Sequence, residues 1–246
     1  MVTMKNMTKP SIGRVMAVGL AAVCGIPAMP AAERTETNPS PAMIQLPAPR
    51  QESKTSLEFA LSRRRSVREF GPQALTLAEV SQLLWAAQGT TGPSGHRTAP
   101  SAGALYPLEV LLVAGNVDGL PAGIYRYRPG GHALARVAEG DKRAGLAAAA
   151  LDQESVKAAP ATVAIAAVPE RTAGKYGKRA ERFVHLEAGH AAQNVHLQAV
   201  ALDLGSVAVG AFDDARLKQV LALAGNEQAL YLIPVGRPRP ADAAPR

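Results

Sequence analysis

Apolar runs bounded by polar or turn-forming residues recur along the second half of this chain. Leu108–Ala114 and residues 162–168 are almost continuously apolar, which is typical of buried strands. Residues 206–211 and 230–235 predict two further strands. Residues 124–128 and 133–137 predict a hairpin closed by Pro129, Gly130 and Gly131.

Helical periodicity fills the segments around these strands. We expect helices at residues 56–64, 76–89, 141–157, 179–204 and 213–223. Thr76 and Glu79 have the spacing of a capping box, and Gly205 is a natural residue to follow a helix end. Helices and strands therefore alternate, and residues 89–103 form a loop rich in Gly, Ser, Thr and Pro.

The predicted helix at 179–204 has an unusual distribution of apolar residues. From Phe183 to Leu202 it carries Ala and other apolar residues on nearly all sides. A helix that is apolar all round is buried all round. We therefore expect a central helix, or one that a second subunit covers.

The first 32 residues have the pattern of a secretory signal. Lys5, Lys9 and Arg14 precede an apolar segment at 15–26, which is too short for a comfortable transmembrane helix. Small residues then offer a cleavage site after Ala31 or Ala32. We expect export, to the periplasm, of a mature protein with no membrane span; an uncleaved N-terminal anchor is the alternative.

The rest of the chain divides by composition. Residues 33–53 are rich in proline and predict a linker or extended arm. Residues 54–238 predict one folded domain, and residues 239–246 a flexible tail. The single cysteine, Cys24, lies in the signal, so the mature chain has no disulfide, catalytic thiolate or cysteine metal ligand.

Composition excludes several classes of protein. Of the 246 residues, 47% are hydrophobic and 19% charged, so the chain can bury a core and is not disordered as a whole. Loss of the three basic residues in 1–32 lowers the net charge from +7 to +4, too mild to indicate nucleic-acid binding. Aromatic residues, at 4%, are too scarce for a base-stacking surface.

Several common catalytic motifs are missing from the sequence. It has no phosphate-binding P-loop, no dinucleotide-binding glycine pattern after a strand and no nucleophile elbow. His185, His190 and His196 share one predicted helix, but offsets of five and six residues place them on different faces. We expect them to be core or helix-contact residues, and we predict no metal site.

Four segments instead suit a flat ligand that carries a phosphate. Arg64, Ser66 and Arg68 alternate cations with a hydroxyl, which fits a dianion, although a solvated surface is the simpler interpretation of an arginine cluster. Small residues let backbone amides approach a ring closely. The other three segments are the small-residue loop 100–107, the strand-to-helix turn 209–214 and the strand end 234–238.

In this order, the segments resemble the flavin-dependent nitroreductase superfamily, and most of all its SagB-type, azoline-oxidase-like branch. The motifs are R-x-S-x-R, P-S-A-G-A-x-Y-P-x-E, G-I-Y-x-Y, E-A-G-H-A-A-Q-N, V-G-A-F-D and I-P-V-G-R-P. The resemblance covers residues 54–238. It implies an α+β fold with a central, mostly antiparallel sheet flanked by helices, and an intertwined homodimer with two FMN molecules at the subunit interface. The long apolar helix would then lie at the dimer core.

The resemblance also implies roles for individual residues. Those of the arginine segment would bind the FMN phosphate and ribityl chain, and those of the small-residue loop would lie along the flavin of the other subunit. The turn at 209–211 would bring a backbone amide to N5 of the ring, and the strand end would contact the phosphate. The residues are Arg64, Arg65, Ser66 and Arg68; Ser101, Ala102 and Gly103; Val209, Gly210 and Ala211; and Gly236 and Arg237.

Lys175 and Tyr176 are the candidate catalytic residues. In azoline oxidases of the SagB-type branch a Lys-Tyr pair is implicated as the proton acceptor, and these two residues occupy a similar place; a basic surface loop is the alternative.

The export signal and the lack of a peptide-recognition domain argue against a peptide substrate. The function expected is an FMN-dependent oxidoreductase that transfers hydride to or from a small substrate, with NAD(P)H as a candidate donor. A non-catalytic flavin-binding or ligand-sequestering envelope protein is the alternative.

Overall fold

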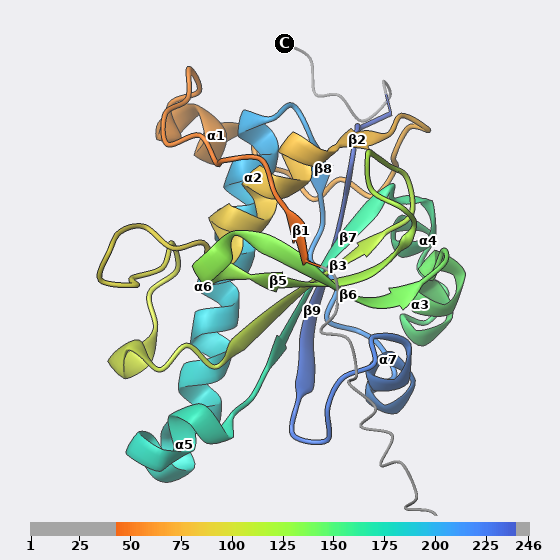
Figure 1. Cartoon of the computed structure of the whole chain (residues 1–246). Coiled ribbons are helices and arrows are strands. Elements are labelled where there is room, and N and C mark those ends of the chain that lie inside the picture. The colour runs from red at the N-terminus through yellow and green to blue at the C-terminus, as the bar shows by residue number, and fades with distance from the viewer. Residues whose placement is uncertain (1–42, 240–246) are drawn as a thin grey trace, which may run out of the picture. The chain divides into compact units, whose positions relative to one another are not determined.

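The computed structural model describes residues 43–239, which form an antiparallel sheet with helices on both faces (Figure 1). The sheet has seven strands in the order β1-β6-β5-β3-β7-β9-β8, and each neighbouring pair is antiparallel. A small parallel pair, β2 with β4, lies apart from it. The strands are β1 Met43–Gln45, β2 Leu75–Thr76, β3 Leu108–Ala114, β4 Val117–Asp118, β5 Gly123–Arg128, β6 Ala133–Glu139, β7 Ala161–Ala167, β8 Gly205–Ser206 and β9 Gln228–Gly236.

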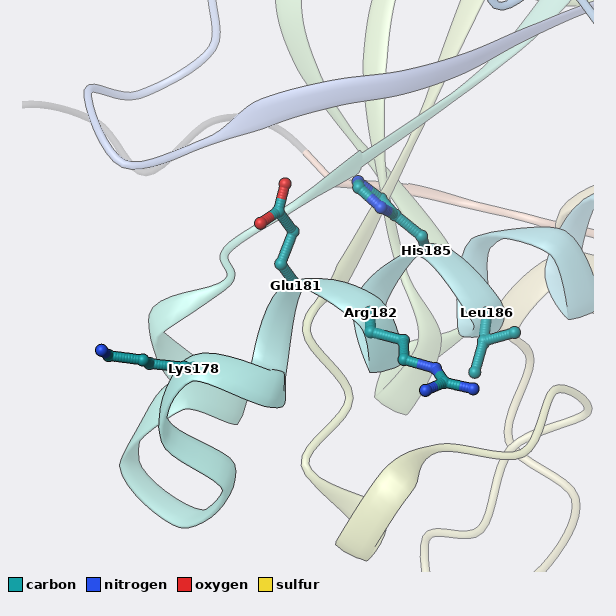
Figure 2. Close-up of a pocket in the computed structure, with 5 residues that line it drawn as sticks. All are labelled: Lys178, Glu181, Arg182, His185 and Leu186. Carbon is teal, nitrogen blue, oxygen red and sulfur yellow. The ribbon is translucent and has the colours of Figure 1, made fainter.

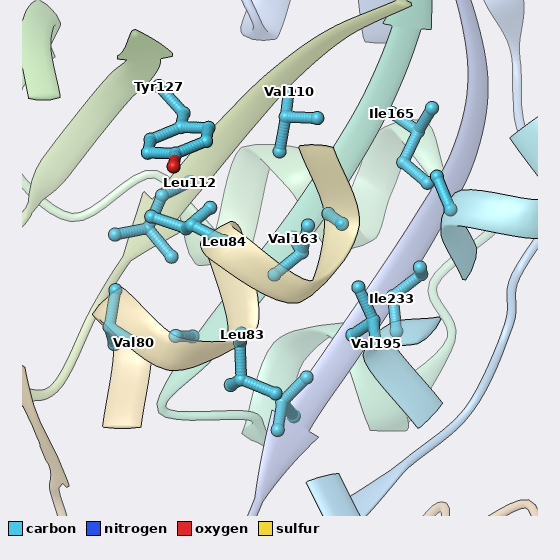
Figure 3. Packing of buried hydrophobic residues seen from close by; sticks show 14 of the residues in the cluster. Val80, Leu83, Leu84, Val110, Leu112, Tyr127, Val163, Ile165, Val195 and Ile233 are labelled. Carbon is cyan, nitrogen blue, oxygen red and sulfur yellow. The ribbon is translucent and has the colours of Figure 1, made fainter. Parts of the chain in front are cut away.

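Side chains that alternate along the central strands divide the core into two clusters. In β3, Val110 and Leu112 face one cluster, while Leu111 and Val113 face the other. The first cluster is packed by α2 (Leu77–Gln88) and α6 (Ala180–Ala201) (Figure 3). The second is packed by α3 (Arg143–Ala149), α4 (Glu154–Ala158) and α7 (Asp214–Val220). The predicted α+β class with a mostly antiparallel sheet and a long helix is confirmed.

The long helix α6 is buried on one face only. Its buried residues recur every three or four positions, from Val184 through Ala188 and Ala191 to Ala199. Leu186, on another face, is 51% exposed. The single chain therefore does not bury this helix all round, because the sheet and neighbouring helices cover only part of its circumference. Of the two expectations for this helix, cover by a second subunit stays a prediction.

Two helix starts are as predicted, and one predicted helix is broken. Thr76 and Glu79 form the complete capping box of α2, and Asp213 caps α7. The helix expected at 141–157 is instead two short helices, α3 (Arg143–Ala149) and α4 (Glu154–Ala158). Leu151 and Asp152 take left-handed backbone angles between them, which no continuous α-helix allows.

The packed part of the chain begins earlier than residue 54. Met43–Gln45 pairs with β6, and Leu46 is only 4% exposed, so the end of the expected linker belongs to the sheet. The helices α1 (Leu57–Arg63) and α5 (Glu170–Tyr176) complete the fold, and α5 was not predicted. The predicted signal and residues 240–246 lie outside the described residues. Among those described, no helix is both long and apolar enough to cross a membrane.

Candidate active site

The arginine segment lies beside the strand ends that the sequence predicted to join it. Ser66 forms an isolated bridge with Ser206 of β8, and the Val67 amide donates to the Ser206 carbonyl at 3.0 Å. Further along, the Gly71 amide donates to the Arg237 carbonyl at 2.8 Å. Backbone hydrogen bonds thus bring the predicted segments 64–68 and 236–237 together.

Two glycines make this close approach of the chain segments feasible. A methyl group on Gly205 would lie 2.6 Å from Val67 Cγ1, and one on Gly236 would lie 2.7 Å from Pro160 Cδ. Both distances are too short for real side chains. Gly236 is itself buried, so in the described chain it serves packing against Pro160 and Phe70.

The arginines of this region have different surroundings. Arg65 donates to the carbonyls of Ser62 and Arg64, which folds its guanidinium onto its own backbone. Arg237 is paired with Glu79 and donates to the Leu202 carbonyl. Arg64 and Arg68 have no hydrogen bond or ion pair from their side chains within the described residues. Those two cations are therefore the ones available to an anion.

His196 is a buried residue near enough to Arg64 to be affected by its charge, whereas the sequence predicted a core or helix-contact residue. It is 8% exposed, and its Nδ1 lies 2.8 Å from Ser206 Oγ. Burial, together with the nearby charge of Arg64, lowers the pKa of His196 to about 4. The helical pattern showed that this side chain is buried, but not which loop it supports.

The small-residue loop has an unusual backbone. Gly103, Ala104 and Tyr106 all have positive φ angles, of 66°, 54° and 47°. Such angles are unfavourable for the two residues that carry a Cβ, and clusters of strained residues mark functional sites. Gly103 is exposed, so this strained loop is presented at the surface of the chain.

The two predicted catalytic residues approach this loop. A methyl group on Gly103 would lie 3.0 Å from Lys175 Nζ and 3.1 Å from Tyr176 Oη. Both residues lie at the C-terminal end of α5, and the Tyr176 ring packs edge-on against Phe183 with 4.8 Å between centroids. Residues from separate predicted motifs thus form one group: Gly103, Lys175 and Tyr176.

The third predicted segment, 209–211, presents its backbone at a sheet edge. Val209 exchanges backbone hydrogen bonds with Leu232 at 2.8 and 2.9 Å, which replaces the longer strand predicted at 206–211. Gly210 and Ala211 are exposed, and the Ala211 carbonyl accepts from Gln153 Nε2 at 3.0 Å. This anchoring fixes the turn directly before α7.

A wide surface pocket, which we call the hollow, lies at the N-terminal end of α6, near α5 (Figure 2). Lys178, Glu181, Arg182, His185 and Leu186 line its space of about 480 Å³. None of these residues belongs to the segments predicted to bind FMN. We therefore place the candidate site at the two groups above and not in this hollow.

Glu187 is a further residue that the sequence motifs did not single out as functional. It is 2% exposed on α6, and Gln88 Nε2 lies 3.5 Å from its Oε1. Burial raises the pKa of this carboxyl above its ordinary value. Its place beside Ser101 connects α6 to the loop that carries Gly103.

Comparison with known proteins gives a consistent picture. The model of the Nitroreductase family matches residues 61–237. A Methanocaldococcus jannaschii protein named as a nitroreductase is 45% identical over 194 residues, which is 79% of this chain and 96% of that protein.

Two solved structures named as nitroreductases share the fold, each with a TM-score of 0.72. One, from Ralstonia eutropha, is 32% identical, and the match covers 82% of this chain and 91% of the Ralstonia chain. The other, from Anabaena variabilis, is 29% identical over 82% of this chain, but this chain spans only 42% of its length. The chain therefore belongs to the Nitroreductase family.

Proposed function

We propose that this protein is an FMN-dependent oxidoreductase that transfers hydride between bound FMN and a small substrate, with NAD(P)H as the electron donor. Proteins of the Nitroreductase family generally use FMN, which supports the cofactor assignment. The placement in the SagB-type branch, the homodimer and export to the periplasm are part of the same proposal.

The residues present fit FMN. Its dianionic phosphate needs cations, and Arg64 and Arg68 are side chains without an ion pair in the described chain. Ser66 lies exposed between them as a hydroxyl partner. The flat ring needs neighbours without bulk, and the exposed Gly103 and Gly210 provide them. When bound, FMN would supply the hydride chemistry itself.

The position of Lys175 and Tyr176 against Gly103 is the observation that carries the proposal. Residues 101–103 are the segment that we expect to lie along the flavin ring, so any group touching Gly103 lies close to a substrate on that ring. The Tyr176 hydroxyl and the Lys175 ammonium can hold a proton there and exchange it with the substrate. Hydride transfer to most small acceptors requires such a proton.

Exposed apolar side chains support the proposed homodimer. Leu57, Phe59 and Leu61 of α1 and Leu186 of α6 are between 50% and 61% exposed. Large apolar side chains gathered on the surface indicate an interaction site. A second copy over α1 and α6 would cover the part of the long helix that the single chain leaves open.

Two measurements test the proposed function. The purified protein, with FMN added if necessary, should show a flavin absorption spectrum and oxidise NAD(P)H in the presence of a quinone or nitroaromatic compound. Tyr176→Phe should lower kcat about 100-fold with little change in FMN affinity, because the proton donor is lost. Lys178→Met, in the following turn, is the matched control. A protein that takes up FMN but has no turnover would support the non-catalytic flavin-binding alternative. One that binds no FMN would exclude both the proposed function and that flavin-binding alternative.

A further inference from the structure

Glu187 is a buried carboxyl with defined partners. At 2% exposure it cannot be solvated by bulk water, so its oxygens need donors from the protein. Gln88 Nε2 lies 3.5 Å from its Oε1, and the neighbouring Ser101 hydroxyl favours the charged form of the carboxyl. Gln88 is completely buried at the end of α2, so three distant parts of the chain meet at this carboxyl.

Arg97 and Tyr106 connect Gln88 to Ser101. Arg97 NH1 donates to Gln88 Oε1 at 3.0 Å, and the Arg97 guanidinium lies 4.4 Å from the centroid of the Tyr106 ring. The Tyr106 amide donates to Ser101 Oγ at 2.9 Å. Glu187, Gln88, Arg97, Tyr106 and Ser101 are therefore joined in one chain of contacts, with Ser101 beside Glu187 at its two ends. We call this group the buried ring, after its buried members Glu187 and Gln88.

The buried ring encloses the strained loop. Its members Ser101 and Tyr106 stand at the two ends of the segment that contains Gly103 and Ala104. Left-handed angles at Ala104 and Tyr106 persist only if surrounding contacts determine the backbone. Arg97 and Ser101 hold Tyr106 from its side chain and its amide, which are the contacts that such strain requires.

We propose that the buried ring is a preformed clamp that fixes the Ser101–Tyr106 loop for the flavin, with Glu187 and Arg97 as positioning residues. The proposal rests on the proposed function in one respect, that the ligand of the loop is FMN. Glu187 touches neither FMN nor substrate; it acts through Ser101. A loop that is ordered before binding loses less conformational freedom on binding, which raises affinity.

The directions of the hydrogen bonds provide a specific test. Glu187 accepts from Gln88, while the Gln88 carbonyl oxygen accepts from Arg97. In Glu187→Gln the new amide has two orientations. In one, its NH₂ lies against the NH₂ of Gln88, and turning Gln88 over moves the conflict to Arg97. In the other, its NH₂ faces Ser101 Oγ, which already accepts from the Tyr106 amide. Adding Gln88→Glu restores every bond, because the new carboxylate accepts from both the new amide and Arg97. The double exchange should therefore rescue the single one.

The experiment measures the loop in the cofactor-free protein and FMN binding separately. Hydrogen exchange of the Tyr106 amide should be at least tenfold faster in Glu187→Gln than in the wild type, and the Kd for FMN at least tenfold higher. The double variant Glu187→Gln/Gln88→Glu should be within about threefold of the wild type in both. Glu181→Gln, an exposed carboxyl on the same helix, is the control and should change neither.

The outcomes separate this proposal from the proposed function. Wild-type exchange in Glu187→Gln, or a double variant no better than the single one, would overturn the clamp. If the wild type binds no FMN, the proposed function fails, while the exchange rates still decide whether the ring holds the loop. If Glu187→Gln does not fold, Arg97→Lys replaces it; loss of the planar contact with Tyr106 should speed exchange at that amide about threefold, and unchanged exchange would contradict the clamp.

Discussion

The two halves of the candidate site are built in opposite ways. The loop around Gly103 is held by the buried ring and pressed against Lys175 and Tyr176, so its contacts come from the protein itself. The arginine segment is fixed through its backbone, but Arg64 and Arg68 extend without a protein partner in the described chain. The loop half has its contacts before a ligand binds. The arginine half has two cations that a bound anion would pair with.

The proposed binding of FMN would account for this difference. A flat ring is recognised by shape, which requires a backbone fixed in advance. A phosphate is recognised by charge, and long arginine side chains can adjust to it. We therefore expect changes in the loop half to affect the order of the loop and the turnover of the enzyme. Changes in the arginine half should affect the affinity for the cofactor and how far that affinity depends on the charged phosphate.

The largest expected effect is a loss of stability on acidification. It arises at His196, which lies near the arginine half. Burial and the charge of Arg64 hold the pKa of His196 at about 4, against an ordinary value of 6.5. The unfolded chain therefore takes up this proton near pH 6.5 while the folded chain does not. His196 contributes stability above pH 6.5, and the free energy of unfolding should fall by up to about 3 kcal/mol as the pH drops to about 4.

Chemical denaturation between pH 7 and pH 4 checks this expectation. His196→Asn removes the titrating group and should flatten this part of the profile, although other groups contribute; His132, whose pKa burial also lowers, is one. A His196→Asn profile parallel to that of the wild type would show that His196 is not held neutral.

Loss of Arg64 should have the next largest effect. Arg64→Ala removes a charge-assisted contact with the phosphate, so the Kd for FMN should rise about 30-fold, or about 2 kcal/mol. Quenching of FMN fluorescence on binding measures it. Riboflavin, which has no phosphate, should bind the variant and the wild type alike; an equal loss for riboflavin would mean that Arg64 supports the fold and not the phosphate.

A smaller effect is expected at Gly103, in the loop half. Gly103→Ala carries a left-handed angle and a Cβ near Lys175 and Tyr176, whereas Gly95→Ala carries a similar angle, φ 74°, with nothing within 4 Å. Each should lose about 1 kcal/mol of stability from backbone strain. Only Gly103→Ala should also lower kcat, because only there does the methyl group displace the proposed proton donors. Equal kcat values would contradict the proposed contact.

The smallest effect is expected at Arg65. Its guanidinium already donates hydrogen bonds to the carbonyls of Ser62 and Arg64 on an exposed surface. Arg65→Ala should therefore change both FMN affinity and stability by less than about 0.5 kcal/mol. A loss of affinity as large as that of Arg64→Ala would show that Arg65 turns towards the ligand and that the arginine half rearranges on binding.

Local signals in the sequence predicted the fold well where one segment determines the outcome. The capping box at Thr76 and the β5–β6 hairpin need only neighbouring residues, and both are present. The break at Leu151 and Asp152 was missed because alanine-rich residues around it favour a continuous helix. Met43–Gln45 was missed because it becomes a strand only through its partner, β6.

The sequence named candidate site residues but could not show how they are arranged. The motifs named Gly103 and Lys175 separately, and only the folded chain places them in contact. The role of Glu187 depends on Gln88 and Arg97, two residues in no motif. His196 appeared as one more buried position on a helix, because periodicity identifies the inward face and not the loop that lies over it.

The contact between Gly103 and Tyr176 has a genetic consequence. In the proposed dimer the loop reaches the flavin of the other copy, so each reaction centre would take Arg64 from one copy and Tyr176 from the other. A dimer of one Arg64→Ala chain and one Tyr176→Phe chain would then contain one centre with both defects and one with neither. Two impaired alleles, expressed in the same cell, would therefore give mixed dimers that each contain one intact centre.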